Sequence, residues 1–306
     1  MLSALTGFVV VGVAILIGYI LGRINLLGEH ARPVLARLTF FVLSPFLLFV
    51  VLAEADVRTL FSSLLPVSAI AAVTVIALYA VVARLLWRRS VAETTIGSLS
   101  AGQVNSNNIG IPLSLYLLGD AAFPAPVILL QLLVFTPITM AILDAVTSGR
   151  SSLAKTIGRV VTNPIVLGSA LGAAVSISGI ELPEVVMAPA ELVANACVPV
   201  LLISYGLSLY GQRVLGAHGR RRDVILATTL KLVVMPAVAW AVAALVFALP
   251  RADVLVIVVL AALPTAQNVF NYAQRFDVGE AIARDSVFLT TIGCIPVLLA
   301  VTAILS

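Results

Sequence analysis

The feature of this sequence that most limits its fold is a series of ten apolar stretches, each near the ~20 residues that a helix needs to cross a bilayer. Lipid offers no partner to a backbone N–H or C=O, so segments that cross it repeatedly must be helical. Only 10% of the residues are charged, against roughly a quarter in soluble domains. We predict an all-α integral membrane protein with ten transmembrane helices, at residues 4–22, 34–53, 64–86, 95–118, 124–146, 161–178, 188–209, 224–248, 253–274 and 284–304.

The lysines and arginines divide unequally between the two sets of connections. Fifteen of the 18 follow odd-numbered spans, counting the helix ends, whereas Arg58 and Arg251 lie on the other side and Lys231 falls inside a span. Because positive residues concentrate on the cytoplasmic side, we predict a multi-pass protein of the cell (plasma or inner) membrane with both termini extracytoplasmic. The basic excess then indicates membrane topology and anionic lipid, and no nucleic acid partner.

The first apolar stretch has no basic segment before it. It is also longer than the 7–15-residue core of a signal peptide. We therefore predict that it is retained as the first span.

Two halves of the chain resemble each other at offsets of 154 to 160 residues. LTFFVLSPFLL (38–48) aligns with LVANACVPVLL (192–202), QLLVFTPIT (131–139) with TTIGCIPVL (290–298), and AGQVNSNNIGIP (101–112) with AALPTAQNVFNY (261–272). Each half holds five spans, an odd number, so the second must enter the membrane from the opposite side. We predict two inverted five-helix repeats, residues 1–148 and 149–306, an architecture common among secondary transporters.

The fourth and ninth spans carry amides and helix-breaking residues at matching positions. Pro112 removes a backbone donor and Gly110 lowers helix preference, so we expect the chain to unwind there, as at Pro264 in the ninth span. Paired, interrupted spans in the two halves point to a transporter's binding site. The candidate substrate-binding residues of these spans are Asn105, Asn107, Asn108, Gly110, Pro112, Pro264, Thr265, Gln267, Asn268 and Asn271.

The chemistry of these spans favours an anion. A half-helix that begins after each break presents free N–H groups and a positive dipole end, and asparagine amides can donate to a carboxylate. The alternative is that the amides join helices across the bundle. Ser44 and Gln131 either line the cavity or pack, and Lys231 is either a counter-charge or a side chain that reaches back to the interface.

The sequence lacks the motifs that other classes of function would require. The two histidines, His30 and His218, lie in predicted loops, and no HExxH, GxSxG or paired intramembrane aspartates occur, so we predict no enzyme and no cofactor. Cys197 and Cys294 lack the spacing of a metal site and are predicted to pack. A sodium-coupled bile-acid-type symporter and a channel remain as alternatives, and coupling stays open between proton, sodium and none.

The segments NSNNIGIPLSLYLLGD (105–120) and LPTAQNVFNYAQRFD (263–277) resemble the two crossover segments of the auxin efflux carrier family, in its bacterial PIN-like members. The resemblance covers the whole chain. It implies a scaffold domain (helices 1, 2, 6 and 7), a transport domain (helices 3–5 and 8–10) and helices that cross at Pro112 and Pro264. It also implies a small organic anion substrate, auxin-like or malate/malonate-like, elevator-type alternating access and a homodimer. The long cytoplasmic loop of many plant members is absent, so auxin itself does not follow.

Overall fold

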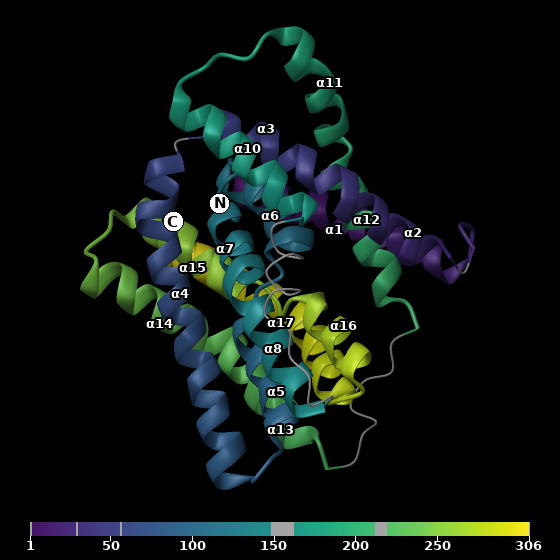
Figure 1. Cartoon of the computed structure of the whole chain (residues 1–306), viewed down its shortest axis with the longest axis vertical. Helices are drawn as coiled ribbons and strands as arrows, with labels where there is room; N and C mark the ends of the chain where they lie inside the picture. Colours follow the sequence, from purple (N-terminus) through teal and green to yellow (C-terminus); the bar gives the residue numbers. More distant parts are fainter. Residues whose placement is uncertain (1, 29, 56, 148–161, 212–218, 306) are drawn as a thin grey trace. The chain divides into compact units, whose positions relative to one another are not determined.

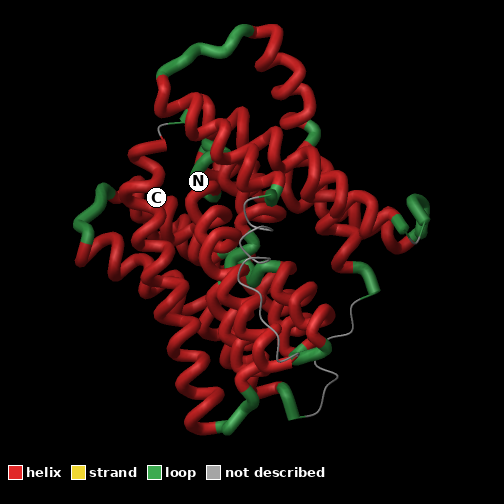
Figure 2. Tube along the Cα trace, viewed as in Figure 1, coloured by secondary structure: helices red, strands yellow, loops and turns green. Residues whose placement is uncertain are grey.

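The computed structural model describes residues 2–28, 30–55, 57–147, 162–211 and 219–305, and within them helices are joined by turns and loops (Figure 1, Figure 2). Within these ranges a single isolated bridge is the only β-type pairing. The all-α class is confirmed. Six helical segments within these ranges are long and apolar enough to cross a membrane: Pro33–Glu54, Leu64–Leu86, Ala125–Thr147, Glu184–Leu207, Arg221–Val246 and Glu280–Leu305.

The count of ten spans and the inverted orientation of the two halves remain predictions. The predicted boundary at residues 148/149 lies outside the described ranges, as do the loop residues Arg150, Lys155, Arg159, Arg213 and His218.

The chain divides into two compact units, and each draws on both halves of the sequence. Unit 1 comprises Met1–Ser62, Asn107–Leu129 and Gly158–Gln212. Unit 2 comprises Ser63–Ser106, Leu130–Ile157 and Arg213–Ser306.

Unit 1 is assembled around glycines that let helix backbones meet. Gly18 of α1 and Gly206 of α12 leave no room for a Cβ, because each would collide with a carbonyl oxygen of the other helix. Gly168 and Gly172 of α10 face the carbonyls of α3 in the same way. Small residues at such spacing are typical of helix contacts in membranes. The helices are α1 (Leu2–Arg23), α2 (Ala31–Leu38), α3 (Ser44–Glu54), α6 (Ile111–Leu113), α7 (Ala125–Leu130), α10 (Pro164–Ser178), α11 (Glu184–Asn195) and α12 (Cys197–Leu209).

Unit 2 has a buried apolar cluster that packs α5 against α16 and α17. Side chains of α5, including Ile96 and Leu99, pack there with Val269 and Ala273 of α16 and Ala283 of α17. The helices are α4 (Val57–Val81), α5 (Val91–Gly102), α8 (Thr136–Thr147), α13 (Arg221–Thr229), α14 (Met235–Ala241), α15 (Arg251–Ala262), α16 (Gln267–Phe276) and α17 (Glu280–Leu305).

Within unit 2 the same local structures recur at a constant offset of 160 residues. The π-helical turn Val82–Leu86 corresponds to Val242–Val246, and the 12-residue α5 corresponds to the 12-residue α15. Between turn and helix, Arg88 and Ala248 both adopt left-handed backbone, with φ of 52° and 50°.

Four prolines sit just after π-helical turns. The turns are Thr39–Leu43, Ser106–Gly110, Gln131–Phe135 and Leu230–Val234, and they precede Pro45, Pro112, Pro137 and Pro236. A proline ring crowds the carbonyl one turn back and offers no N–H, and a widened turn accommodates both defects within a helix. The predicted unwinding at Gly110 and Pro112 is therefore wrong. The chain is helical from Ser106 to Leu118, and the break lies upstream at residues 103–105.

Candidate functional site

The two broken helices of unit 2 end against each other. Beyond α5 and α15 the chain turns extended, and Val104 and Thr265 form an antiparallel bridge. The N–H of Asn105 donates to the carbonyl of Pro264 at 2.9 Å, and the N–H of Ala266 donates to the carbonyl of Gln103 at 3.1 Å. We call residues 103–105 and 263–266 the crossing segments. The predicted break at Pro264 is where the structure has it.

The first crossing segment is held by one side chain. Gln131 accepts from the N–H of Val104 through Oε1 at 2.8 Å and donates from Nε2 to the carbonyl of the same residue at 3.0 Å. Both ends of the amide are thus engaged with backbone. Of the two interpretations that the sequence left open for Gln131, the geometry favours a structural contact over a free cavity-lining group.

The second crossing segment is held by hydroxyls. The N–H of Thr265 donates to Oγ1 of Thr290 at 3.0 Å, and Oγ1 of Thr265 donates to the carbonyl of Ser100 near the end of α5 at 2.6 Å. Thr265 is fully buried, so its side chain serves the fold. Thr290 was missed by the sequence analysis, although the alignment of QLLVFTPIT with TTIGCIPVL pairs it with Gln131.

These contacts satisfy the irregular backbone but leave neighbouring polar side-chain atoms unused. Gln103 and Ser106 are 2% and 1% exposed, and Gln103 Nε2 and Ser106 Oγ have no hydrogen-bond partner among the residues that the structure describes. A buried donor without a partner is costly, and a ligand acceptor would satisfy it. Asn105 lies between them and is 4% exposed.

The helix that follows the second crossing segment presents amides on one side. Asn268 and Asn271, three residues apart on α16, are exposed, and Gln267 is half-buried. Val269 and Ala273 of the same helix belong to the buried cluster. The first turn of α16 also carries the partial positive charge of a helix N-terminus.

The remaining amides and Ser44 belong to unit 1. Asn107 and Asn108 lie in the π-helical turn before Pro112, where Asn107 Nδ2 donates to Asn108 Oδ1 at 3.2 Å. Ser44 is fully buried, with its Oγ 3.8 Å from Sγ of Cys197. Cys197 and Cys294 are free and buried, as packing residues would be.

Lys231 lies inside unit 2. Its side chain is fully buried, and Nζ donates to the carbonyl of Ala261 at 2.6 Å and contacts Sδ of Met235 at 3.2 Å. Ala261 lies in the last turn of α15, directly before the second crossing segment.

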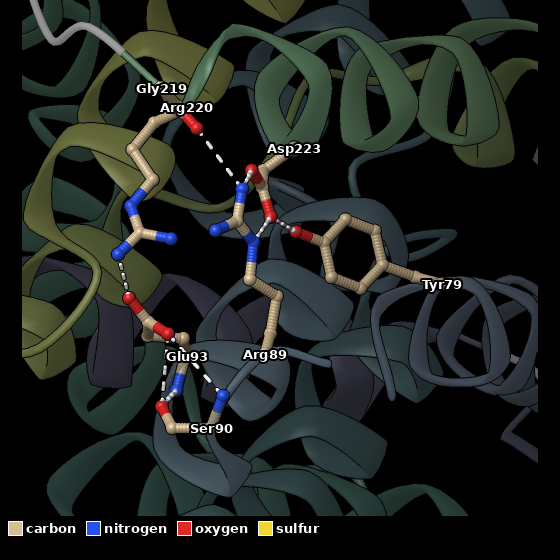
Figure 3. A network of polar contacts seen from close by, with 7 residues as sticks. All are labelled: Tyr79, Arg89, Ser90, Glu93, Gly219, Arg220 and Asp223. Carbon is tan, nitrogen blue, oxygen red and sulfur yellow. Dashed lines mark hydrogen bonds and ion pairs between the residues drawn. The ribbon is translucent and has the colours of Figure 1, made fainter. Parts of the chain in front are cut away.

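A polar network fixes the corner before α5 (Figure 3). The buried carboxylate of Asp223 accepts two bonds from Arg89, at 3.0 and 2.7 Å, and one from the hydroxyl of Tyr79 at 3.4 Å. Arg220 pairs with Glu93, which also forms a capping box with Ser90 at the start of α5. The hydrogen bonds to Asp223 raise the pKa of Arg89, which keeps this guanidinium charged. The network joins α5 to α13 within unit 2.

Comparison with known families agrees with a membrane protein of this kind. A family model described as membrane transport protein matches residues 4–155 and 143–302. No individual curated protein matches the chain.

Proposed function

This chain belongs to the auxin efflux carrier-type family of membrane transport proteins, and we propose that it carries small organic anions across the cell membrane by elevator-type alternating access. The substrates that we propose are carboxylates of auxin-like or malate/malonate-like size. Membership of the family makes this a membrane transport protein, which implies a small-molecule substrate.

The observation that carries the proposal is the pair of crossing segments with unused donors beside them. Gln103 Nε2 and Ser106 Oγ can each donate to a carboxylate oxygen, and their burial makes such bonds valuable. The N-terminus of α16 adds a positive dipole end, and Asn268 adds an exposed amide one residue into that helix. A carboxylate matches this set of donors, because it offers only acceptors.

The division of the chain supports the proposed mechanism. Unit 2 contains both crossing segments together with α4, α8, α13 and α17, which come from opposite halves of the sequence. We propose that predicted spans 3–5 and 8–10, most of whose residues lie in unit 2, form the transport domain, although residues 107–129 of spans 4 and 5 cluster with unit 1. We propose that predicted spans 1, 2, 6 and 7 (residues 4–22, 34–53, 161–178 and 188–209) form the scaffold against which it moves, in a homodimer.

Uptake into proteoliposomes tests the proposal. The substrates would be radiolabelled malonate, malate and indole-3-acetate, each with and without imposed proton and sodium gradients. We expect saturable uptake of one of them by the unaltered protein. Gln103→Leu and Asn268→Ala should each raise KM about tenfold, the effect of roughly 1.4 kcal/mol of lost binding.

The matched control is Asn195→Ala, which removes an exposed amide from α11 in unit 1. It should leave KM unchanged. Normal KM values in both Gln103→Leu and Asn268→Ala would reject this site. Uptake of a neutral or cationic solute, with no uptake of any of the three acids, would reject the anion.

A further inference from the structure

Lys231 is a buried amine that the proposed carboxylate contacts do not use. It lies in the π-helical turn Leu230–Val234, and none of its side chain is exposed. Among the described residues, no ion pair includes it, and its Nζ binds only a backbone carbonyl and a thioether. An ammonium group without a carboxylate partner is expensive to bury, so this position calls for an explanation.

The contact with Ala261 supplies part of that explanation. The last carbonyls of a helix have no intrahelical partner and carry the negative end of its dipole. Ala261 is in the last turn of α15, so the ammonium lies at that negative end, immediately before the extended residues 263–266.

The first broken helix has no such charge. At the offset of 160 residues that relates α5 to α15, the position of Lys231 corresponds to Ala71, which is fully buried and apolar. The last turn of α5 is instead bound by a hydroxyl, since Thr265 Oγ1 donates to the carbonyl of Ser100. The buried lysine therefore serves one of the two broken helices and is no general requirement of a helix that ends inside unit 2.

In transporters with broken helices, coupling cations are held by unwound carbonyls and by the C-terminal ends of half-helices. Lys231 donates to an oxygen atom of this kind, the carbonyl of Ala261 at the C-terminal end of α15. An ammonium donor at 2.6 Å from the carbonyl of Ala261 occupies the direction from which a metal ion would approach that oxygen.

We propose that Lys231 is a built-in cation, which replaces a coupling sodium ion at the end of α15 and offsets the negative charge of the substrate. This rests on the proposed transport of an organic anion. It predicts a carrier that needs no sodium, and it argues against the sodium-coupled alternative that the sequence left open. Lys231 and Ala261 both belong to unit 2, so in the proposed elevator movement this cation site moves with the transport domain.

Thermal melting of the purified protein in detergent tests the cation site without any substrate. The melting temperature of the unaltered protein should be equal in sodium chloride and choline chloride at the same ionic strength. Lys231→Ala should melt lower and should regain stability when methylammonium or sodium is added, since the emptied space would admit a small cation. Met235→Leu, which changes the other contact of Nζ and keeps the charge, is the matched control and should respond to neither ion.

Uptake of malonate and indole-3-acetate then tests the consequence for transport. The unaltered protein should take up its acid equally in sodium and choline media. Lys231→Met should lose at least about tenfold of this uptake, while Met235→Leu keeps it.

Specific stabilisation of the unaltered protein by sodium, or sodium-dependent uptake, would overturn the proposal. So would a Lys231→Ala protein that responds to methylammonium no more than the unaltered protein does. If Lys231→Ala does not fold, the sodium comparison on the unaltered protein decides the matter alone. Absence of all acid uptake would count against the proposed function, whereas the melting results bear on the cation alone.

Discussion

The two broken helices of unit 2 are built alike and held differently. Both α5 and α15 have 12 residues, follow a left-handed residue and end in extended backbone at the crossing. The first crossing segment is held by both ends of the Gln131 amide. The second is held by two hydroxyls, since the N–H of Thr265 donates to Thr290 Oγ1 and Thr265 Oγ1 donates to the carbonyl of Ser100. The backbone geometry is thus repeated, while the side chains that complete it are not.

The comparison shows that the crossing segments need hydrogen-bond partners for their backbone groups, whatever side chain supplies them. A backbone group inside a membrane must find a partner in the protein, because water is absent. An amide, a hydroxyl or an ammonium can serve, provided that a neighbouring helix places it within reach. Within the described residues, a lysine amine binds the end of the second broken helix, through Lys231, and an apolar alanine stands at the corresponding position of the first, so the two ends differ in their side chains even where their backbones agree.

The largest effect should come from Gln131→Leu, which removes both hydrogen bonds from the side chain to the backbone of Val104 in the first crossing segment. It leaves the N–H and the carbonyl of Val104 without their side-chain partner, at about 1–3 kcal/mol for each unsatisfied group. We expect a strong loss of thermal stability in detergent and a fall in maximal uptake of more than about tenfold. Leu133→Ala, an exposed position in the same π-helical turn, is the control. A Gln131→Leu protein that melts like the unaltered one would show that the amide contributes nothing.

The next effect concerns the corners that precede the two helices. Asp223→Ala removes the carboxylate that binds Arg89 and Tyr79 at the corner before α5. Breaking a buried pair costs about 3–5 kcal/mol, and we expect the lower end because the Arg89 side chain is partly exposed. Thermal denaturation in detergent measures it.

The second corner provides the control for that substitution. Asp253 in the first turn of α15 corresponds to Glu93 in α5 at the same offset, and it takes part in none of the three ion pairs found in the described ranges. Asp253→Ala should therefore change the melting temperature little. Equal losses in Asp223→Ala and Asp253→Ala would mean that the network gives the first corner no special stability.

The smallest of the three effects should come from Thr290→Val, at the second crossing segment. It removes one acceptor, so the N–H of Thr265 loses its partner while the bond from Thr265 to Ser100 remains. We expect a loss of about 1–3 kcal/mol, the cost of one buried N–H left without a partner, against two such groups in Gln131→Leu. Thr290→Ser keeps the hydroxyl and should melt like the unaltered protein. A loss as large as that of Gln131→Leu would contradict the expectation that the one bond of Thr290 stabilises its crossing segment less than the two bonds of Gln131 stabilise theirs.

Properties that depend only on neighbouring residues in the sequence were predicted correctly. Apolar length predicted the helices, and the crossover segments predicted the family, which the family match confirms. Pro264 was expected at a break and lies in one. The same rule failed at Pro112, because the preceding π-helical turn absorbs the proline and the helix continues to Leu118.

The individual roles were beyond local reasoning. Gln131 and Lys231 were each left with two interpretations. The sequence of a span is the same whether its polar side chain faces a cavity or binds a backbone carbonyl. The structure gives them partners 27 and 30 residues away in the chain. Thr290 has no unusual character in the sequence and gains its role only from lying beside Thr265.

The sequence by itself determined that this chain is an all-helical membrane protein of a transporter family, because hydrophobic length and charge bias act span by span. The tertiary structure decided where the fourth helix breaks, which side chains complete the two crossing segments and where the buried ammonium is directed. Those features depend on which helices become neighbours, and a backbone group left open by a break is satisfied by whatever donor or acceptor its neighbour brings within about 3 Å.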